Sequence, residues 1–340
     1  MNNPVPRHEK DHAASGTVEQ ESTTFPGDSW SSLPTNRDQF GPALEPLLRK
    51  ACGNRLSAIT WFRADWQRGG AATAYATYEE EQDSHQVVVK VPVRPAERRW
   101  LQHLQSFPQV APKLYAHGQA LGGYDLAWVV MQRISHGPFG PEWGPAAFDL
   151  VIEAAGRFYA ATSGVPLNAP PPARNWQQIL DLARRNVQRH QLANEQRWKA
   201  SLKKAQRQLK RWVALWSDRP IDQWCHGDLH LGNAMSHHPP PDGPAVLVDY
   251  ADVHPGHWIE DAVYFEHLYW AHRSMLGQRK ICSAIARQRK ELNLPVNDDW
   301  PKFASVRRAL LAMSTPARLE HVGIPSHVQA ALKVLEQEVR

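Results

Sequence analysis

The sequence has few cysteines and no long apolar run. Its 340 residues include three cysteines, Cys52, Cys225 and Cys282, which lie far apart and form no Cys-x-x-Cys pair. Neither a disulfide framework nor a structural zinc cluster is therefore expected. No stretch approaches the ~20 apolar residues of a membrane-spanning helix, and the polar N-terminal stretch contains no apolar signal core. We expect a cytoplasmic protein that is neither secreted nor bound to a membrane.

The sequence also lacks a strong overall charge, although its charge is unevenly distributed. Lys and Arg total 39 and Asp and Glu total 34, which gives a net charge of +5. Within residues 184–211, however, ten basic residues are opposed only by Glu195. This segment could contact nucleic acid or an acidic partner. We favour a solvated face of an amphipathic helix, because Trp and Leu recur at steps of three and four between Trp198 and Trp216.

Composition and pattern divide the chain into three parts. Apolar residues make up 42% of the chain, which includes 14 Trp, so most of it should fold. Residues 1–40 are rich in Ser, Thr, Asn and Pro and are predicted to form a flexible tail. The remainder is predicted to form a strand-rich part over residues 41–135 and a helical part over residues 136–340.

The strand-rich part alternates short extended segments with two helices. Its predicted elements are helix 44–51, strands 55–65, 71–78 and 86–93, helix 95–107, and strands 112–118 and 125–134. The order of the strands favours an antiparallel sheet that carries one helix. In the helical part, the apolar spacing over residues 176–216 predicts one long helix.

The densest polar signal lies in residues 224–235, WCHGDLHLGNAM. His226, Asp228 and Asn233 follow the His-x-Asp-Leu-x-x-x-Asn spacing of kinase catalytic loops, in which the Asp accepts a hydroxyl proton and the Asn reaches a magnesium ion. The run AVLVD then predicts a buried strand that ends in Asp249. An Asp at that position is well placed to provide a second oxygen ligand for magnesium.

The motif HGDLHLGN, followed by LVDY and a further Asp at position 261, resembles the aminoglycoside phosphotransferase and choline kinase superfamily. The resemblance implies an α+β, two-lobed, protein kinase-like fold, with a small antiparallel sheet lobe and a larger helical lobe. It also implies transfer of a phosphoryl group from ATP to a hydroxyl of a small molecule, with Mg²⁺. Asp228 matches the catalytic base, Asn233 and Asp249 match the magnesium ligands, and Asp261 matches a carboxylate that supports the catalytic loop. His226 would hold that loop in place.

The same resemblance assigns nucleotide-binding residues to the strand-rich part. Lys90 matches the lysine that binds the ATP phosphates, and Glu97 is its expected ion-pair partner. Gly69 and Gly70 lie where the family places its phosphate-covering loop, although they form no Gly-x-Gly-x-x-Gly motif. The segment from Met131 through Arg133 to Ile134 is the expected hinge, whose backbone would receive the adenine.

The spacing and the charge narrow the expected acceptor. Only eleven residues separate Asp249 from Asp261, too few for the activation segment of a protein kinase, so a protein substrate is not expected. The basic segment 184–211 argues against a polycationic acceptor and favours a neutral or acidic one. An aromatic-rich stretch could instead enclose a quaternary amine, although core packing is the favoured role for most of its members, Trp258, Tyr264, Phe265, Tyr269 and Trp270.

Two rival functions fit parts of the sequence. One is a metal-dependent hydrolase, whose ligands would come from Cys225, His226, Asp228, His230 and the His237-His238 pair. That interpretation leaves Asn233, Asp249 and Lys90 without a role. The other is a non-catalytic nucleotide-binding or scaffolding relative, although all four residues expected of the enzyme, Lys90, Asp228, Asn233 and Asp249, are present.

Overall fold

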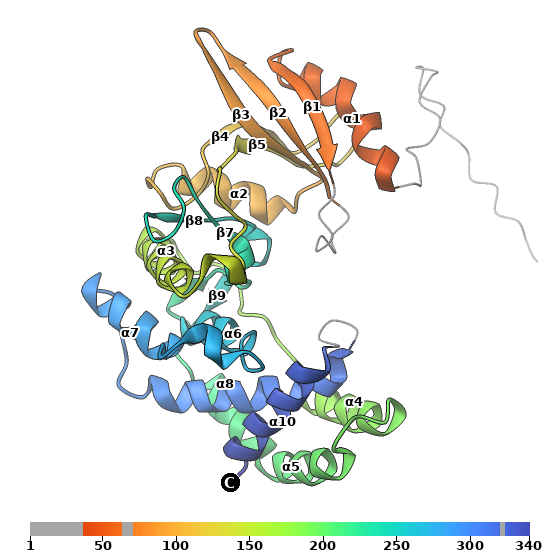
Figure 1. Ribbon diagram of the computed structural model, residues 1–340, viewed down its shortest axis with the longest axis vertical. Coiled ribbons are helices and arrows are strands. Elements are labelled where there is room, and N and C mark those ends of the chain that lie inside the picture. The colour runs from red at the N-terminus through yellow and green to blue at the C-terminus, as the bar shows by residue number, and fades with distance from the viewer. Residues whose placement is uncertain (1–36, 63–70, 320–323) are drawn as a thin grey trace, which may run out of the picture.

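The computed structural model describes residues 37–62, 71–319 and 324–340. They form two lobes, with a β-sheet at one end of the molecule and a helical lobe at the other (Figure 1). The α+β, two-lobed architecture predicted from the sequence is therefore confirmed. In the part of the chain that the structure describes, no helix combines the length and apolarity needed to cross a membrane.

Five antiparallel strands form the sheet of the first lobe. They lie in the order β1-β2-β3-β5-β4, with bounds β1 Leu56–Phe62, β2 Ala72–Glu80, β3 Asp83–Val91, β4 Leu114–Gly118 and β5 Trp128–Gln132. Because side chains alternate between the faces of a strand, β3 directs Val87, Val89 and Val91 to one face and Lys90 to the other. The valine face is fully buried and packs in one core with Leu44 of helix α1.

Two helices accompany this sheet. Helix α1 (Arg37–Ala51) packs on the valine face, and it begins seven residues before the predicted start, inside the segment 1–40 that the sequence assigned to a tail. Helix α2 (Pro95–Leu104) begins with a proline at its first turn, as predicted. Its Leu101 and Leu104 belong to the core of the helical lobe, so α2 joins the two lobes.

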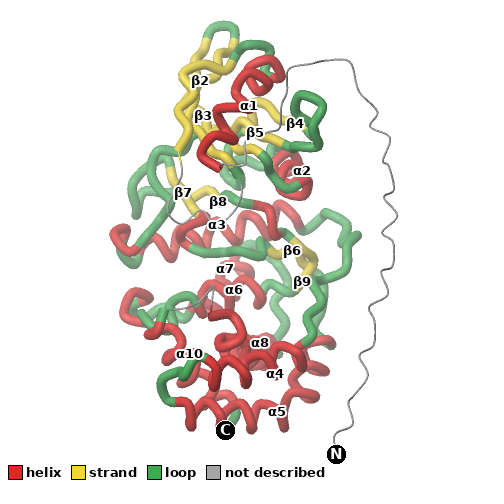
Figure 2. Tube along the Cα trace, turned by 90° about the vertical axis from the view of Figure 1, so that its right-hand side faces the viewer, coloured by secondary structure: helices red, strands yellow, loops and turns green. Residues whose placement is uncertain are grey.

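Seven helices form the frame of the second lobe within the described residues. Their bounds are α3 Ala146–Thr162, α4 Trp176–Arg189, α5 Glu195–Ser217, α6 Ile259–His267, α7 Ile281–Glu291, α8 Trp300–Ser314 and α10 Pro325–Glu338. The single long helix predicted over residues 176–216 is wrong. The chain breaks at Gln191 and Asn194, both with left-handed backbone (φ 47° and 63°), and α4 and α5 form a hairpin at the end of the molecule opposite the sheet (Figures 1 and 2).

Two short pairs of antiparallel strands lie between the sheet of the first lobe and the lower helices of the second (Figure 1). Strand β6 (Gln223–Cys225) pairs with β9 (His254–Gly256), and β7 (Ala234–Ser236) pairs with β8 (Ala245–Leu247). The segment that contains the sequence motif, residues 226–233, runs from the end of β6 to the start of β7. The two pairs therefore fix both ends of that segment.

Candidate active site

Asp228 lies in the loop between β6 and β7 and is held by three side chains. The Tyr264 hydroxyl donates to Asp228 Oδ1 at 2.6 Å, and the Asn233 carboxamide donates to Asp228 Oδ2 and to its backbone carbonyl, both at 2.9 Å. His230 Nε2 lies 3.5 Å from Oδ2. The carboxylate is therefore fixed in one orientation by donors on both of its oxygens.

These donors keep the Asp228 carboxyl ionised. Burial would raise its pKa, but hydrogen bonds from His230, Tyr264 and Asn233 outweigh burial and hold the pKa below its ordinary value. Burial and the adjacent charge of Asp228 raise the pKa of Tyr264 well above its ordinary value, so that hydroxyl remains a donor. A carboxylate is consequently available at Asp228 throughout the neutral pH range.

Asp261 supports this loop from the first turn of α6. Its two carboxylate oxygens accept from the backbone N–H groups of His226 at 2.7 Å and Gly227 at 2.9 Å, and the Tyr159 hydroxyl adds a third bond at 3.0 Å. Gly227 has φ +84°, and a Cβ there would lie 2.1 Å from the Asp252 carbonyl oxygen. Only glycine fits that position.

His226 is enclosed in the core beneath the loop. Its side chain is 1% exposed, and its ring lies 5.8 Å from the Phe158 ring and 5.3 Å from the Tyr250 ring. Burial lowers the pKa of His226, so the ring is neutral at pH 7. This position suits a residue that packs the loop rather than one that handles a proton.

Hairpin β7–β8 brings Asn233 and Asp249 to the same end. Ala234 pairs with Leu247, and the Val248 N–H donates to the Asn233 carbonyl at 2.9 Å, so the residues that flank the hairpin are neighbours. Asp249 has left-handed backbone with φ 64°. A carboxylate and a carboxamide oxygen are donors that Mg²⁺ prefers, so this pair fits that ion chemically.

Lys90 joins the sheet to the second lobe at this point. Its Nζ lies 2.7 Å from Glu97 Oε1 and 3.3 Å from Asp249 Oδ1, which is 159 residues away in the chain. Burial works against the Lys90 charge, but the two carboxylates outweigh burial and raise its pKa. The structure therefore brings together Lys90, Glu97 and Asp249, three of the residues to which the family resemblance points.

Part of the expected hinge already forms hydrogen bonds within the sheet. Met131 pairs with Val88 of β3, so its side chain shares the sheet face of Lys90. The Arg133 N–H, however, already donates to the Gln86 carbonyl at 3.0 Å, and the Arg133 guanidinium lies 3.9 Å from the centre of the Tyr75 ring. The Arg133 amide is thus unavailable to a base. The expected phosphate-loop residues, Gly69 and Gly70, lie outside the described residues.

The metal-ligand set of a hydrolase is not assembled. Among the described residues, the His, Cys, Asp and Glu side chains close enough to hold a metal are Cys225, His254 and Glu260, which share only Cys225 with the predicted set. Burial raises the pKa of the Cys225 thiol well above its ordinary value, and Glu260 is ion-paired with Arg219 at 2.9 Å. A protonated thiol and an occupied carboxylate are poor metal ligands.

The aromatic stretch of α6 forms core rather than a box for a cation. Trp258, Phe265 and Trp270 are at most 5% exposed, and Phe265 stacks on Phe148 with ring centres 5.6 Å apart. Tyr264 is the exception, since its hydroxyl donates to Asp228, a role that was not predicted from the sequence. It could have been predicted, because Tyr264 follows Asp261 by three residues and therefore lies on the same face of α6.

The basic segment 184–211 lies on α4 and α5, far from the catalytic loop (Figure 1). None of its ten basic residues lines either of the two pockets considered below. Several are exposed, and Arg197 and Lys199 pair with Glu336 and Glu195. This placement agrees with a solvated helix face.

Comparisons with solved structures agree with the fold of the chain. The chain is similar in fold to an aminoglycoside phosphotransferase from Alicyclobacillus acidocaldarius, with 16% identity, a TM-score of 0.54, and coverage of 83% of this chain and 93% of that one. Choline kinase from Cryptosporidium parvum is 10% identical with a TM-score of 0.53, and the match covers 88% of this chain and 94% of that one. A thermostable mutant of aminoglycoside phosphotransferase APH(4)-Ia, solved with AMP-PNP and hygromycin B, is 12% identical with a TM-score of 0.52, and the match covers 88% of this chain and 98% of that one.

No curated protein matches the sequence. The profile of the phosphotransferase enzyme family, however, matches residues 67–287, a stretch that covers more than half of the chain and includes the elements from β2 into α7. That stretch contains Lys90, Glu97, Asp228, Asn233, Asp249 and Asp261. The chain therefore belongs to the phosphotransferase enzyme family.

Proposed function

We propose that this protein transfers the γ-phosphoryl group of ATP to a hydroxyl of a small molecule. The observation that carries the proposal is the contact of Lys90 with both Glu97 and Asp249. It brings a cation suited to phosphate oxygens next to a carboxylate suited to Mg²⁺. In a phosphotransferase these two groups act on the same triphosphate.

Asp228 is the proposed base. The acceptor oxygen forms a bond to the γ-phosphorus while the bond from that phosphorus to the bridging oxygen of ADP breaks, and the hydroxyl proton passes to the Asp228 carboxylate. Because the pKa of Asp228 is low, the carboxylate orients the hydroxyl and accepts its proton late in the transfer. Tyr264 and Asn233 fix the carboxylate for this task.

Asn233 and Asp249 would hold the Mg²⁺ ion, which when bound neutralises negative charge on the triphosphate. Lys90 binds phosphate oxygens, and Glu97 keeps Lys90 oriented. The face of the sheet that carries Lys90 and Met131 would receive the nucleotide. Since the Arg133 amide is occupied, Ile134 and Ser135 are the proposed backbone partners of the base.

The short connection between the motifs supports a small acceptor. Residues 250–260 form a 3-10 turn, strand β9 and the start of α6, and β9 pairs directly with β6. This stretch leaves no extended segment on which a polypeptide substrate could dock. A small molecule with a free hydroxyl fits the site better.

The test is phosphoryl transfer from ATP, with Mg²⁺, by the purified full-length protein across a panel of amino alcohols, sugars, hydroxy acids and nucleosides. We expect acceptor-stimulated release of ADP that falls by about 10²- to 10⁴-fold in Asp228→Asn. Asp242→Asn, an exposed carboxylate in the loop between β7 and β8, is the matched control and should keep wild-type turnover.

Two other outcomes would change the assignment. Nucleotide binding without Asp228-dependent turnover on any acceptor would favour a non-catalytic, nucleotide-binding relative. Absence of nucleotide binding would overturn the proposal altogether.

A further inference from the structure

A pocket of about 360 Å³ lies beside the catalytic loop. It is bordered by the segment before α4, the end of α5, the first turns of α6, and helix α8. We call it the arginine pocket after four of its lining residues, Arg174, Arg219, Arg307 and Arg318.

The arginine pocket reaches the proposed base through two lining residues. Gly227 immediately precedes Asp228, and Tyr264 donates its hydroxyl to Asp228 Oδ1. Asp228 does not itself line the pocket, but a molecule there would contact Gly227 and Tyr264, the two residues that adjoin the Asp228 carboxylate. On the proposed function, this is the acceptor site.

Positive charge exceeds negative charge in the arginine pocket. Its carboxylates are Glu260 and Asp261, against the four arginines. Asp261 uses both oxygens on the backbone of the catalytic loop, and Glu260 is paired with Arg219 at 2.9 Å. The two carboxylates are thus already occupied, and no acidic side chain of the pocket is left to bind a cation.

The other three arginines sense the charge of Glu260 at most from a distance and form no direct ion pair with a carboxylate of the described residues. Arg174 is exposed at the rim, Arg318 is half-buried, and Arg307 is 6% exposed on the wall formed by α8. None of their guanidinium groups makes a hydrogen bond or ion pair with any residue in the ranges 37–62, 71–319 and 324–340, and Nε of Arg307 is buried. Because a buried guanidinium is normally paired, Arg307 is the observation that points to a missing anion.

Aromatic rings hold these guanidinium groups in position. Arg307 lies 5.1 Å from the centre of the Trp216 ring, and Arg174 lies 5.8 Å from that of Trp176. Burial and the charges of Arg174, Arg219 and Arg318 lower the pKa of Arg307 to about 10, although Glu260 opposes them. Arg307 nevertheless stays charged at pH 7. The pocket therefore presents preformed, planar donors that match two oxygens of a carboxylate or phosphate.

We infer that the acceptor is a hydroxylated small molecule with an anionic group, which Arg174, Arg307 and Arg318 bind in the arginine pocket. The inference rests on the proposed function and specifies its substrate class. A carboxylate and a phosphate ester both supply the required oxygens. The reaction consumes the free hydroxyl and leaves the anionic group unchanged.

The test measures binding separately from turnover. Calorimetric titration of the full-length protein uses matched probes, namely glycerol, D-glycerate and glycerol 3-phosphate, then ribose and ribose 5-phosphate, and inorganic phosphate. We expect at least one anionic probe to bind tenfold or more tightly than its neutral partner. Comparison of D-glycerate with glycerol 3-phosphate distinguishes a carboxylate acceptor from a phosphorylated one.

Variants locate the binding site. Arg318→Gln and Arg174→Gln should each weaken the anionic probe about tenfold, whereas Arg318→Lys should recover part of the loss. Arg211→Gln removes an exposed arginine on α5 and should leave binding unchanged. The thermal midpoint of each variant confirms that it is folded.

The outcomes separate this inference from the proposed function. Phosphorylation of neutral probes in preference to anionic ones, or equal anion binding by the Gln variants, would overturn the inference and leave the phosphotransferase intact. Anion binding lost in Arg318→Gln, in a protein that transfers no phosphoryl group, would establish an anion site in the arginine pocket while the proposed function fails, and the acceptor role with it. Failure of every anionic probe to bind would overturn the inference.

Discussion

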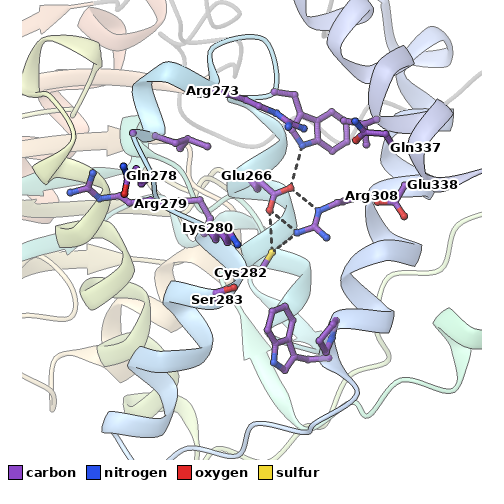
Figure 3. A pocket seen from close by; sticks show the side chains of 17 residues that line it. Glu266, Arg273, Gln278, Arg279, Lys280, Cys282, Ser283, Arg308, Gln337 and Glu338 are labelled. Atoms are coloured by element: carbon purple, nitrogen blue, oxygen red, sulfur yellow. Dashed lines mark hydrogen bonds and ion pairs between the residues drawn. The ribbon is translucent and has the colours of Figure 1, made fainter.

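Two pockets of the helical lobe differ in whether their charged side chains are paired with each other. The larger, of about 580 Å³, is lined by residues of α6, α7, α8 and α10, and we call it the Glu266 pocket. There the Glu266 carboxylate receives two bonds of 2.7 Å from Arg308, and contacts Trp270 and Cys282 at 3.4 Å (Figure 3). In the arginine pocket, by contrast, the Arg307 guanidinium makes no direct ion pair with an acidic side chain of the described residues, because Glu260 contacts Arg219 instead.

The difference separates a structural pocket from a binding pocket. In the Glu266 pocket the fold supplies both members of the ion pair, so the charges stabilise the chain and leave little for a ligand. Its other cations are either exposed, like Arg273, or paired, like Arg279 with Asp149 at 2.7 Å. In the arginine pocket the fold supplies an excess of positive charge, which is the arrangement expected where a ligand brings the balancing negative charge. Pocket size alone would have selected the wrong cavity.

Loss of Arg308 should produce the largest change in stability. Arg308→Met leaves Glu266 partly buried without its cation, and we expect the free energy of unfolding to fall by about 2–3 kcal/mol, because both side chains keep some exposure to solvent. Arg273→Met removes an exposed cation from the same pocket and should change it by less than about 0.5 kcal/mol. Urea denaturation checks both values.

The same variant distinguishes the two pockets functionally. Arg308→Met should leave the KM for the acceptor unchanged, whereas Arg318→Gln should raise that KM with little effect on stability. A rise in the acceptor KM for Arg308→Met would assign a ligand to the Glu266 pocket and reverse the comparison.

Glu260 is the acidic side chain that pairs with an arginine in the arginine pocket. Its protonation in acid should produce the next largest change in stability. Burial would raise its pKa, but the interaction with His254, whose Nε2 lies 3.7 Å from Glu260 Oε2, and the charges of Arg307 and Arg219 outweigh burial and lower that pKa from 4.5 to about 2. A depressed pKa stabilises the fold above pH 4.5, and this contribution is lost as the pH falls toward 2. We expect about 2 kcal/mol of it to be lost by pH 3.

The measurement is the free energy of unfolding of wild type and Glu260→Gln at several pH values between 6 and 3. The difference between the two proteins should shrink by about 2 kcal/mol over that range. Parallel pH profiles would show that Glu260 titrates as an ordinary carboxyl, and the arginine pocket would then be less compensated than the structure indicates.

The catalytic motif was predictable from the sequence because its members are close in the chain or follow predicted strands. His226, Asp228 and Asn233 lie in one loop whose ends are set by local β-pairs. Lys90 could be selected from the sequence because it is the one charged residue in the apolar strand predicted over residues 86–93. Its contact with Asp249, across 159 residues, depends on how the lobes meet, and only the resemblance to kinases anticipated it.

The arginine pocket could not be predicted. Its arginines come from four segments between positions 174 and 318, and each one alone has the pattern of a surface residue. The basic segment 184–211 is evident in the sequence because its residues are contiguous, but it lies on an outer helical hairpin (Figure 1). Proximity in sequence therefore brings out the loop that carries Asp228 and Asn233, but not the positive charge that we propose to bind the acceptor.

Arg307→Met should have the smallest effect on stability and an unusual sign. It removes a buried cation that makes no direct ion pair among the described residues but keeps an apolar side chain beside Trp216. Burial and the neighbouring arginines outweigh the attraction of Glu260, so the Arg307 charge opposes folding, and we expect the free energy of unfolding in anion-free buffer to rise by about 1 kcal/mol. Bound anion should abolish that advantage, since it stabilises only the wild type. Thermal unfolding with and without D-glycerate or glycerol 3-phosphate measures both effects. A destabilised Arg307→Met protein in anion-free buffer would mean that Arg307 is satisfied within the fold, and the contrast between the two pockets would then disappear.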